Sequence, residues 1–273
     1  MQKKLITSLV LGALVLVGTA WAQEAEDDGP VYTRVASWAV KRAQWDAFVD
    51  DYKAHDMKVM QKLFDDGVLI EFGLDGETLH GSDGWTHYSW YSTRSMADMA
   101  RVDEAWESYM DSMSASDKQK VNSNFASMIE KHQDSLRRGD VGHFSDSNAD
   151  GSYYYSWSVK VNPGSGDDFR SYFDEYNGKT MKQLMEDGTL IAYGLSVQEI
   201  SSVAPGRRTV WAQLPDLAAY DKLMAASRAD WGGMSDEQGR ARWAGIQEMV
   251  DLGSYRESLS NSIVFRQRAH HND

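Results

Sequence analysis

The chain has 273 residues, a formal net charge of −13 and no cysteine. Without cysteine it can form neither disulfides nor a reactive thiolate, so burial of apolar side chains must stabilise the fold. The acidic balance argues against nucleic acid and anionic lipid as partners. Ten Trp, 13 Tyr and 8 Phe provide apolar surface for one large domain or for two of ordinary size.

The first 22 residues have the pattern of a secretory signal peptide. Two lysines precede an apolar run over residues 5–17, and residues 20–22 (Ala-Trp-Ala) match a small-x-small cleavage site. The apolar run is shorter than the roughly 20 residues that a membrane-spanning helix needs. We therefore expect cleavage after residue 22, a periplasmic or secreted protein without a membrane span, and a disordered lead-in over residues 23–30.

Two stretches of the chain are near copies of each other. Leu63–Leu74 (LFDDGVLIEFGL) and Leu184–Leu195 (LMEDGTLIAYGL) are identical at seven of twelve positions. Each runs from the end of a helix through Asp-Gly into a strand that closes on Gly-Leu. The two copies predict that the chain contains one α/β unit as a tandem repeat. We expect the repeats at residues 31–145 and 153–268, with a linker over 146–152 and a tail over 269–273.

The first repeat predicts the element order β-α-β-β-α-α-β. Val31–Lys41 is rich in β-branched and aromatic residues and predicts a strand. An amphipathic helix is expected over residues 43–64, because apolar side chains recur there at a spacing of three and four. After the strand of the copied motif, we expect a third strand over 85–92, helices over 96–113 and 117–138, and a short closing strand near 141–145.

The second repeat predicts the same order of elements. Tyr153–Lys160 shares Ser-Trp-x-Val-Lys with the first strand of the first repeat. The later elements are expected as a strand over 207–214, helices over 217–234 and 236–257, and a closing strand over 262–268. This order is the split βαβ arrangement, a four-stranded antiparallel sheet with helices on one face. The bare faces of the two sheets are expected to bury each other.

The element order and the Asp-Gly entry into the second strand resemble the dimeric α+β barrel superfamily, which includes antibiotic-biosynthesis-monooxygenase-like and NIPSNAP-like domains. The resemblance spans nearly all of the chain after the signal peptide. It implies an α+β fold of two tandem ferredoxin-like units, with antiparallel sheets packed face to face as an intramolecular α+β barrel. Members of the superfamily usually dimerise to form the barrel, so a monomer of this chain is expected to suffice.

Three histidines of the first repeat fall on elements that are expected to face the core. His55 is on the first helix, His87 on the third strand and His143 on the closing strand, and the second repeat has no histidine at any equivalent position. Divergence between duplicates is expected where one half keeps an active pocket, here between the helices and the sheet of the first repeat. The alternative is that each histidine is structural and hydrogen-bonded within the core.

Aromatic residues of the first repeat complete the predicted pocket. Trp38 is a candidate wall of the pocket, and Tyr52, Tyr88 and Tyr91 could each offer a hydroxyl to a ligand or, as the favoured alternative, fill the cavity themselves. A tryptophan recurs at the position of Trp38 in the second repeat, Trp157, which favours packing as the alternative. The predicted ligand-binding residues are Trp38, Tyr52, His55, His87, Tyr91 and His143.

The sequence predicts no cofactor and no metal site. It has no His-x-x-x-His or cysteine-based ligand spacing, and no phosphate loop, dinucleotide fingerprint or nucleophile elbow. Residues 146–151 match the first half of a calcium loop, but Trp157 stands where the bidentate Glu would be needed. A linker turn is the favoured interpretation of that run.

These patterns favour an exported binding protein that holds a small apolar or aromatic ligand in its first repeat. The resemblance implies one alternative, a cofactor-independent monooxygenase with His55 or His87 as the general base for an activated aromatic substrate. Two further alternatives are haem handling, which would use a neutral imidazole as iron ligand, and a purely structural role in the cell envelope.

Overall fold

Eight antiparallel strands close into one barrel in a computed structural model that describes residues 29–79, 84–201 and 206–272. The predicted signal peptide lies outside the described residues. The first half contains β1 (Tyr32–Val40), a 3-10 turn (Arg42–Gln44), α1 (Trp45–Ala54), α2 (Asp56–Asp65), β2 (Glu71–Glu77), β3 (His87–Thr93), α3 (Met96–Asp111), α4 (Ala115–Met128) and β4 (Ile129–Phe144).

The second half follows the same order of elements. It contains β5 (Tyr153–Val161), α5 (Gly166–Tyr172), a π-helical segment (Phe173–Gly178), α6 (Lys179–Glu186), β6 (Ala192–Ser201), β7 (Arg207–Leu214), α7 (Leu217–Gly232), α8 (Asp236–Met249) and β8 (Val250–Gln267). A last strand, β9 (His270–Asn272), pairs with the end of β4, so part of the expected tail is in a strand. No helix among the described residues is long and apolar enough to cross a bilayer.

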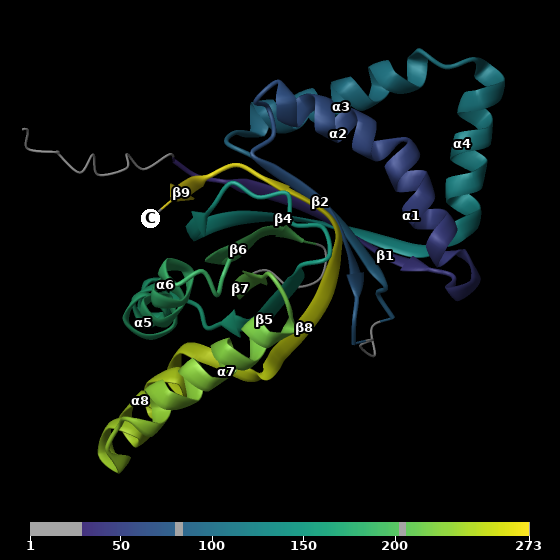
Figure 1. Cartoon of the computed structure of the whole chain (residues 1–273). Helices are drawn as coiled ribbons and strands as arrows, with labels where there is room; N and C mark the ends of the chain where they lie inside the picture. The colour runs from purple at the N-terminus through teal and green to yellow at the C-terminus, as the bar shows by residue number, and fades with distance from the viewer. Residues whose placement is uncertain (1–28, 80–83, 202–205, 273) are drawn as a thin grey trace, which may run out of the picture.

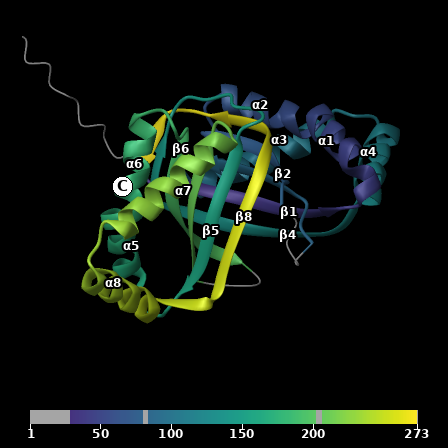
Figure 2. The ribbon, with the colours of Figure 1, turned by 60° about the horizontal axis from the view of Figure 1, so that its bottom comes forward.

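Strand pairing across the two halves closes the barrel. The order is β1-β3-β2-β8-β5-β7-β6-β4, and β4 pairs back onto β1. The last strand of each half pairs with the second strand of the other, with Phe144 opposite Ala192 and Gln267 opposite Glu71. Figure 2 shows β5 and β8 on one wall and β1 and β4 on another. The halves are thus joined edge to edge by hydrogen bonds, which leaves no open sheet edge in the barrel.

The long last strands contradict two of the predicted helices. The sequence predicted helices to residues 138 and 257, but α4 ends at Met128 and α8 at Met249, and β4 and β8 begin at the next residue. The reason is that the inward side chains of β4, such as Gln133 and Arg137, are polar like the outward ones. The alternation of polar and apolar residues that marks a half-buried strand is therefore missing.

The helices lie outside the barrel, with α1–α4 on one side and α5–α8 on the other (Figure 1). The predicted helix over residues 43–64 is broken at His55, whose backbone is non-helical, and the π-helical segment occupies the matching place in the second half. Each helix layer forms its own core against the outer face of the strands, and Phe48 and Phe72 both belong to the core of the first half. Full burial of such a side chain contributes about 1.5–3 kcal/mol.

The glycine repeated in the two copied motifs leaves room for a tryptophan ring inside the barrel. A Cβ at Gly73 would lie 2.6 Å from Cζ2 of Trp90, and one at Gly194 would lie 2.7 Å from Cζ2 of Trp211. Each such Cβ would also strike a backbone carbonyl oxygen of the neighbouring strand. Only glycine therefore permits the paired strand and the indole ring to pack at this place.

We predict that Gly194→Ala lowers the free energy of unfolding by about 1–3 kcal/mol, because the backbone carbonyl and the Trp211 ring must both move. Gly239→Ala is the matched control, since Gly239 lies in α8 with open space around its Cα, and it should be neutral or stabilising by up to about 1 kcal/mol. Denaturant unfolding followed by circular dichroism measures both. Equal stabilities of the two variants would contradict the packing described for Trp211.

Candidate functional site

The interior of the barrel contains a cavity of about 510 Å³. This volume lies within the range of about 300–1,000 Å³ that is typical of small-molecule sites. Residues from all eight barrel strands line it, and seven of the lining residues are aromatic. The aromatic lining residues are Trp85, Tyr88, Trp90, Phe144, Tyr154, Trp211 and Phe265.

The cavity is closed at one end and open at the other. Glu71, Gln213 and Gln267 line the end where β1 and β5 begin, and all three are buried. At the opposite end, Leu79 after β2 and Arg256 near the start of β8 line the cavity and are exposed to solvent. A small molecule would therefore enter past Leu79 and Arg256 and reach the buried polar groups at the far end.

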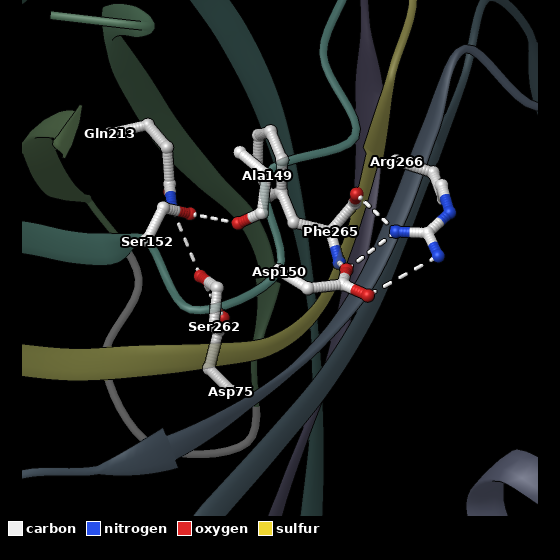
Figure 3. A network of polar contacts seen from close by, with 8 residues as sticks. All are labelled: Asp75, Ala149, Asp150, Ser152, Gln213, Ser262, Phe265 and Arg266. Atoms are coloured by element: carbon white, nitrogen blue, oxygen red, sulfur yellow. Dashed lines mark hydrogen bonds and ion pairs between the residues drawn. The ribbon is translucent and has the colours of Figure 1, made fainter. Parts of the chain in front are cut away.

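A chain of buried hydrogen bonds crosses from one half to the other at the closed end (Figure 3). The amide nitrogen of Gln213 donates to Oγ of Ser152 at 2.7 Å and to Oγ of Ser262 at 2.9 Å. Ser262 donates in turn to Oδ1 of Asp75 at 2.6 Å, and the Trp90 indole donates to Oδ2 of Asp75 at 2.8 Å. These bonds fix the Asp75 carboxyl group and the Trp90 ring relative to each other.

The segment between the halves is tied to β8 beside this network. Asp150 accepts from the backbone nitrogen of Phe265 at 2.9 Å and pairs with the guanidinium of Arg266 at 2.5 Å, as Figure 3 shows. Of the two carboxylates in the calcium-like run, Asp150 is therefore engaged by an arginine, and Asp146 accepts a hydrogen bond from the backbone nitrogen of Ala269. Across the described part of the chain, no group of three or more His, Cys, Asp or Glu side chains is arranged to hold a metal ion.

Two carboxyl groups of β2 titrate near neutrality because they are buried in the barrel. Burial raises the pKa of Asp75 from 3.8 to about 7, against the opposing effect of its hydrogen bonds from Ser262 and Trp90. Burial likewise raises the pKa of Glu71 from 4.5 to about 7, although a 2.5 Å hydrogen bond from Ser92 lowers it. Each group can therefore take up or release a proton at neutral pH.

Tyr154 lies between opposite charges in the cavity. Burial raises the pKa of its phenol, and the charge of Asp75 adds to that effect. The charge of Arg137 and a hydrogen bond between the two side chains act in the opposite direction. Since β5 and β4 are not neighbours in the barrel, Arg137 reaches Tyr154 across the cavity. The phenol is a neutral hydrogen-bonding group with the cation on one side and the buried carboxyl group on the other.

Four of the predicted ligand-binding residues pack between the helices and the outer face of the first-half strands. Tyr52 is buried and donates to the backbone oxygen of Gly73 at 3.1 Å. The Trp38 indole donates to Ser89 at 2.9 Å. His87 is buried, with its ring centroid 5.0 Å from that of Phe48. Tyr91 is also buried within this core.

The other two predicted residues lie apart from these and from each other. His55, at the junction of α1 and α2, has Nδ1 3.0 Å from the hydroxyl of Tyr109 on α3. His143 on β4 stacks on Tyr193, which belongs to the core of the second half. The three histidines therefore do not meet in one place. None of the six predicted residues lines the barrel cavity, and their role in ligand binding stays a prediction.

The sequence did contain a signal for the lining residues that were missed. Glu71 and Asp75 interrupt an apolar strand, where an unpaired carboxylate is costly. In the second half, Ala192 stands at the position of Glu71, and Ser196 stands at the position of Asp75. The two acids therefore occur in one half only. Acidic residues at alternate positions of a buried strand indicate a polar interior behind that strand.

No protein-family model and no curated protein sequence matches the chain. Solved structures with a similar fold include a candidate monooxygenase from Lactobacillus acidophilus NCFM, with a TM-score of 0.60 and 12% identity over 90% of this chain and 100% of the other. A candidate monooxygenase from Fusobacterium nucleatum subsp. nucleatum has a TM-score of 0.59 and 8% identity over 89% and 96%. An anthrone oxidase-like protein has a TM-score of 0.52 and 11% identity over 88% and 93%.

At sequence identities of 8–12%, the similarity to these structures shows only that the fold is shared. The fold is a mixed α+β structure with an eight-stranded closed antiparallel barrel, which agrees with the barrel that the sequence resemblance implies.

We predict that Glu71→Gln reduces the dependence of stability on pH. Because the pKa of Glu71 is raised to about 7 in the folded protein, the folded state keeps a proton that the unfolded state releases above about pH 4.5. The free energy of unfolding should then fall as pH rises from about 4.5 to about 7 and level off above it. Between pH 5 and 7.5 the unmodified protein should lose at least about 1 kcal/mol more than the variant does.

Denaturant unfolding at several pH values measures this difference. Asp50→Asn is the control, because it removes the same charge from an exposed position on α1. The same pH dependence in Glu71→Gln and Asp50→Asn would contradict the buried, protonated carboxyl group.

Proposed function

We propose that the protein binds a small aromatic molecule inside the barrel. The observation that supports this most directly is the cavity of about 510 Å³, lined by seven aromatic side chains and a few fixed polar groups. Ligand sites typically combine apolar walls with a small number of oriented hydrogen-bonding groups. Asp75 and Gln213 at the closed end provide such groups.

Two of the three tryptophans that line the cavity, Trp90 and Trp211, are held rigidly enough to serve as binding surfaces. Trp90 lies over Gly73 and is oriented by its hydrogen bond to Asp75. Trp211 lies over Gly194 and is nearly parallel to Tyr154, with centroids 6.2 Å apart and an interplanar angle of 21°. Because these rings are already ordered, binding would cost little side-chain entropy.

We further propose that the chain is a fused duplication of one ferredoxin-like unit. The copied motifs support this, as does the strand order, β2-β3-β1-β4 in the first half and β6-β7-β5-β8 in the second. A single chain then provides both halves of the barrel, so we propose a monomer. The pattern of residues 1–22 supports export to the periplasm or beyond.

We predict that 2-naphthol binds in the barrel and that Ser156→Phe weakens its binding at least tenfold. Ser156 points into the cavity from β5, so a phenyl ring there would occupy the space of the ligand. His55→Ala is the control for a site beneath the helices and should leave the affinity unchanged. Isothermal titration calorimetry measures both, with circular dichroism to confirm folding. Loss of binding in His55→Ala with full binding in Ser156→Phe would place the site beneath the helices instead.

Oxidation of an activated aromatic substrate is the second candidate function, and the pKa of about 7 at Asp75 favours it. At that pKa the carboxylate can act as general base. It would take a proton from a benzylic carbon, and the carbanion would add to O₂ to give a peroxide anion. The proton returns from Asp75 to that anion, and the resulting hydroperoxide loses water, so that one CH₂ group and O₂ yield one carbonyl group and H₂O. This reaction is balanced in atoms and electrons without a cofactor.

We predict that, under this second function, oxygen consumption with anthrone as the probe falls about 100-fold in Asp75→Asn, since a positioned general base contributes about 10²–10⁴-fold. Asp50→Asn should match the unmodified protein. An oxygen electrode measures the rate above the spontaneous background. A rate unaffected by Asp75→Asn would remove Asp75 as the base, and no rate above background in the unmodified protein would leave binding as the function.

A further inference from the structure

Three arginines line the barrel cavity and contact only neutral groups. They are Arg137 on β4, Arg207 on β7 and Arg256 on β8. Arg207 donates to Oγ of Ser158 at 2.8 Å and to a backbone oxygen at 3.0 Å. Arg256 donates to backbone oxygens, and Arg137 has its hydrogen bond with the Tyr154 phenol. Across the described residues, none of the three forms an ion pair with a carboxylate.

The arginines next to them in the sequence behave differently. Arg138 and Arg208 point out of the barrel and share the carboxylate of Asp140, with Arg138 Nη1 2.7 Å from Oδ1. Arg138 is also 2.7 Å from Glu199. On the same two strands, the outward arginines form ion pairs and the inward ones, Arg137 and Arg207, do not, in a chain with 41 acidic residues.

The positive charges inside the barrel act on one another. The pKa of Arg207 is lowered, first by burial and then by the charges of Arg256 and Arg137. Asp251 offsets part of this effect. Burial raises the pKa of Asp75 and the charge of Glu77 adds to the rise, while hydrogen bonds from Ser262 and Trp90 lower it, and no arginine is among the causes. No arginine is among the causes for Glu71 either, so neither of these two buried acids balances the arginine charges.

We propose that these three arginines bind the anionic group of the ligand, and that the ligand is an aromatic carboxylate with its ring against Trp90 and Trp211. This inference rests on the proposed function, because it assigns the chemical class of the molecule held in the barrel. Arginine suits the role, since its planar guanidinium can donate two parallel hydrogen bonds to a carboxylate.

The distribution of charge would also orient the ligand. Arg256 is exposed at the open end, whereas Glu71 and Asp75 are buried on β2 toward the closed end. An entering anion meets the arginines first and would be repelled by a carboxylate at the far end. The anionic group would then stay near the arginines while the ring lies deeper in the barrel.

The test compares 2-naphthoate with 2-naphthamide, which share a ring system and differ in charge. Isothermal titration calorimetry on the full chain should show naphthoate binding about tenfold or more tightly than naphthamide, as expected for hydrogen bonds to a charged group. Arg137→Gln should weaken naphthoate binding about tenfold and leave naphthamide binding nearly unchanged. Arg138→Gln is the matched control, because it removes the same charge from the adjacent, outward-facing position and should change neither affinity.

A second variant keeps the test valid if Arg137→Gln does not fold. Arg256→Gln removes a charge from the exposed rim without affecting Tyr154, and it should weaken naphthoate binding selectively, by several-fold. Equal affinities for the two probes, both lost in Ser156→Phe, would overturn the carboxylate assignment and leave the proposed function intact. No binding of either probe would overturn both. Equal losses in Arg137→Gln and Arg138→Gln would attribute the effect to net charge and also overturn the assignment.

Discussion

The hydrogen-bonded pairing of each half's last strand with the other half is the constraint on which the rest of the structure depends. β4 pairs with β6, and β8 pairs with β2, so neither half has a free sheet edge in the barrel. Because the barrel is closed, the protein has apolar cores outside the strands and a partly polar cavity inside them. The apolar cores lie beneath the helices and stabilise each half, and the cavity is lined by polar and charged as well as aromatic side chains.

This separation accounts for where the two halves differ. Features that pack the barrel are the same in both, such as the glycine over which each tryptophan ring lies. Features that give the cavity its chemistry differ, since Glu71 and Asp75 of the first half correspond to Ala192 and Ser196 of the second. The cavity thus has acids on β2 and arginines on β4, β7 and β8, and this polarity is the basis of the function proposed for it.

Sequence patterns predicted most of the strands and helices, and they placed the candidate site beneath the helices, whereas the cavity lies inside the barrel. The strands over residues 31–41 and 207–214 and the helices that begin at 96 and 217 were predicted well, because their apolar periodicity is clear. The end of β4 was predicted as a closing strand over 141–145, but its earlier part was predicted as helix because both faces are polar near Arg137 and Arg138. A search for polar residues on apolar helix faces led to His55. The cavity is instead lined by the inward side chains of the strands, which a search of helix faces does not examine.

The most direct measurement is a crystal structure of the protein with 2-naphthoate bound. The account predicts the naphthyl ring inside the barrel against Trp90 and Trp211, with its carboxylate at hydrogen-bond distance from Arg137 or Arg207. A ligand found beneath the helices beside His55 or His87, with the barrel filled only by water, would contradict it.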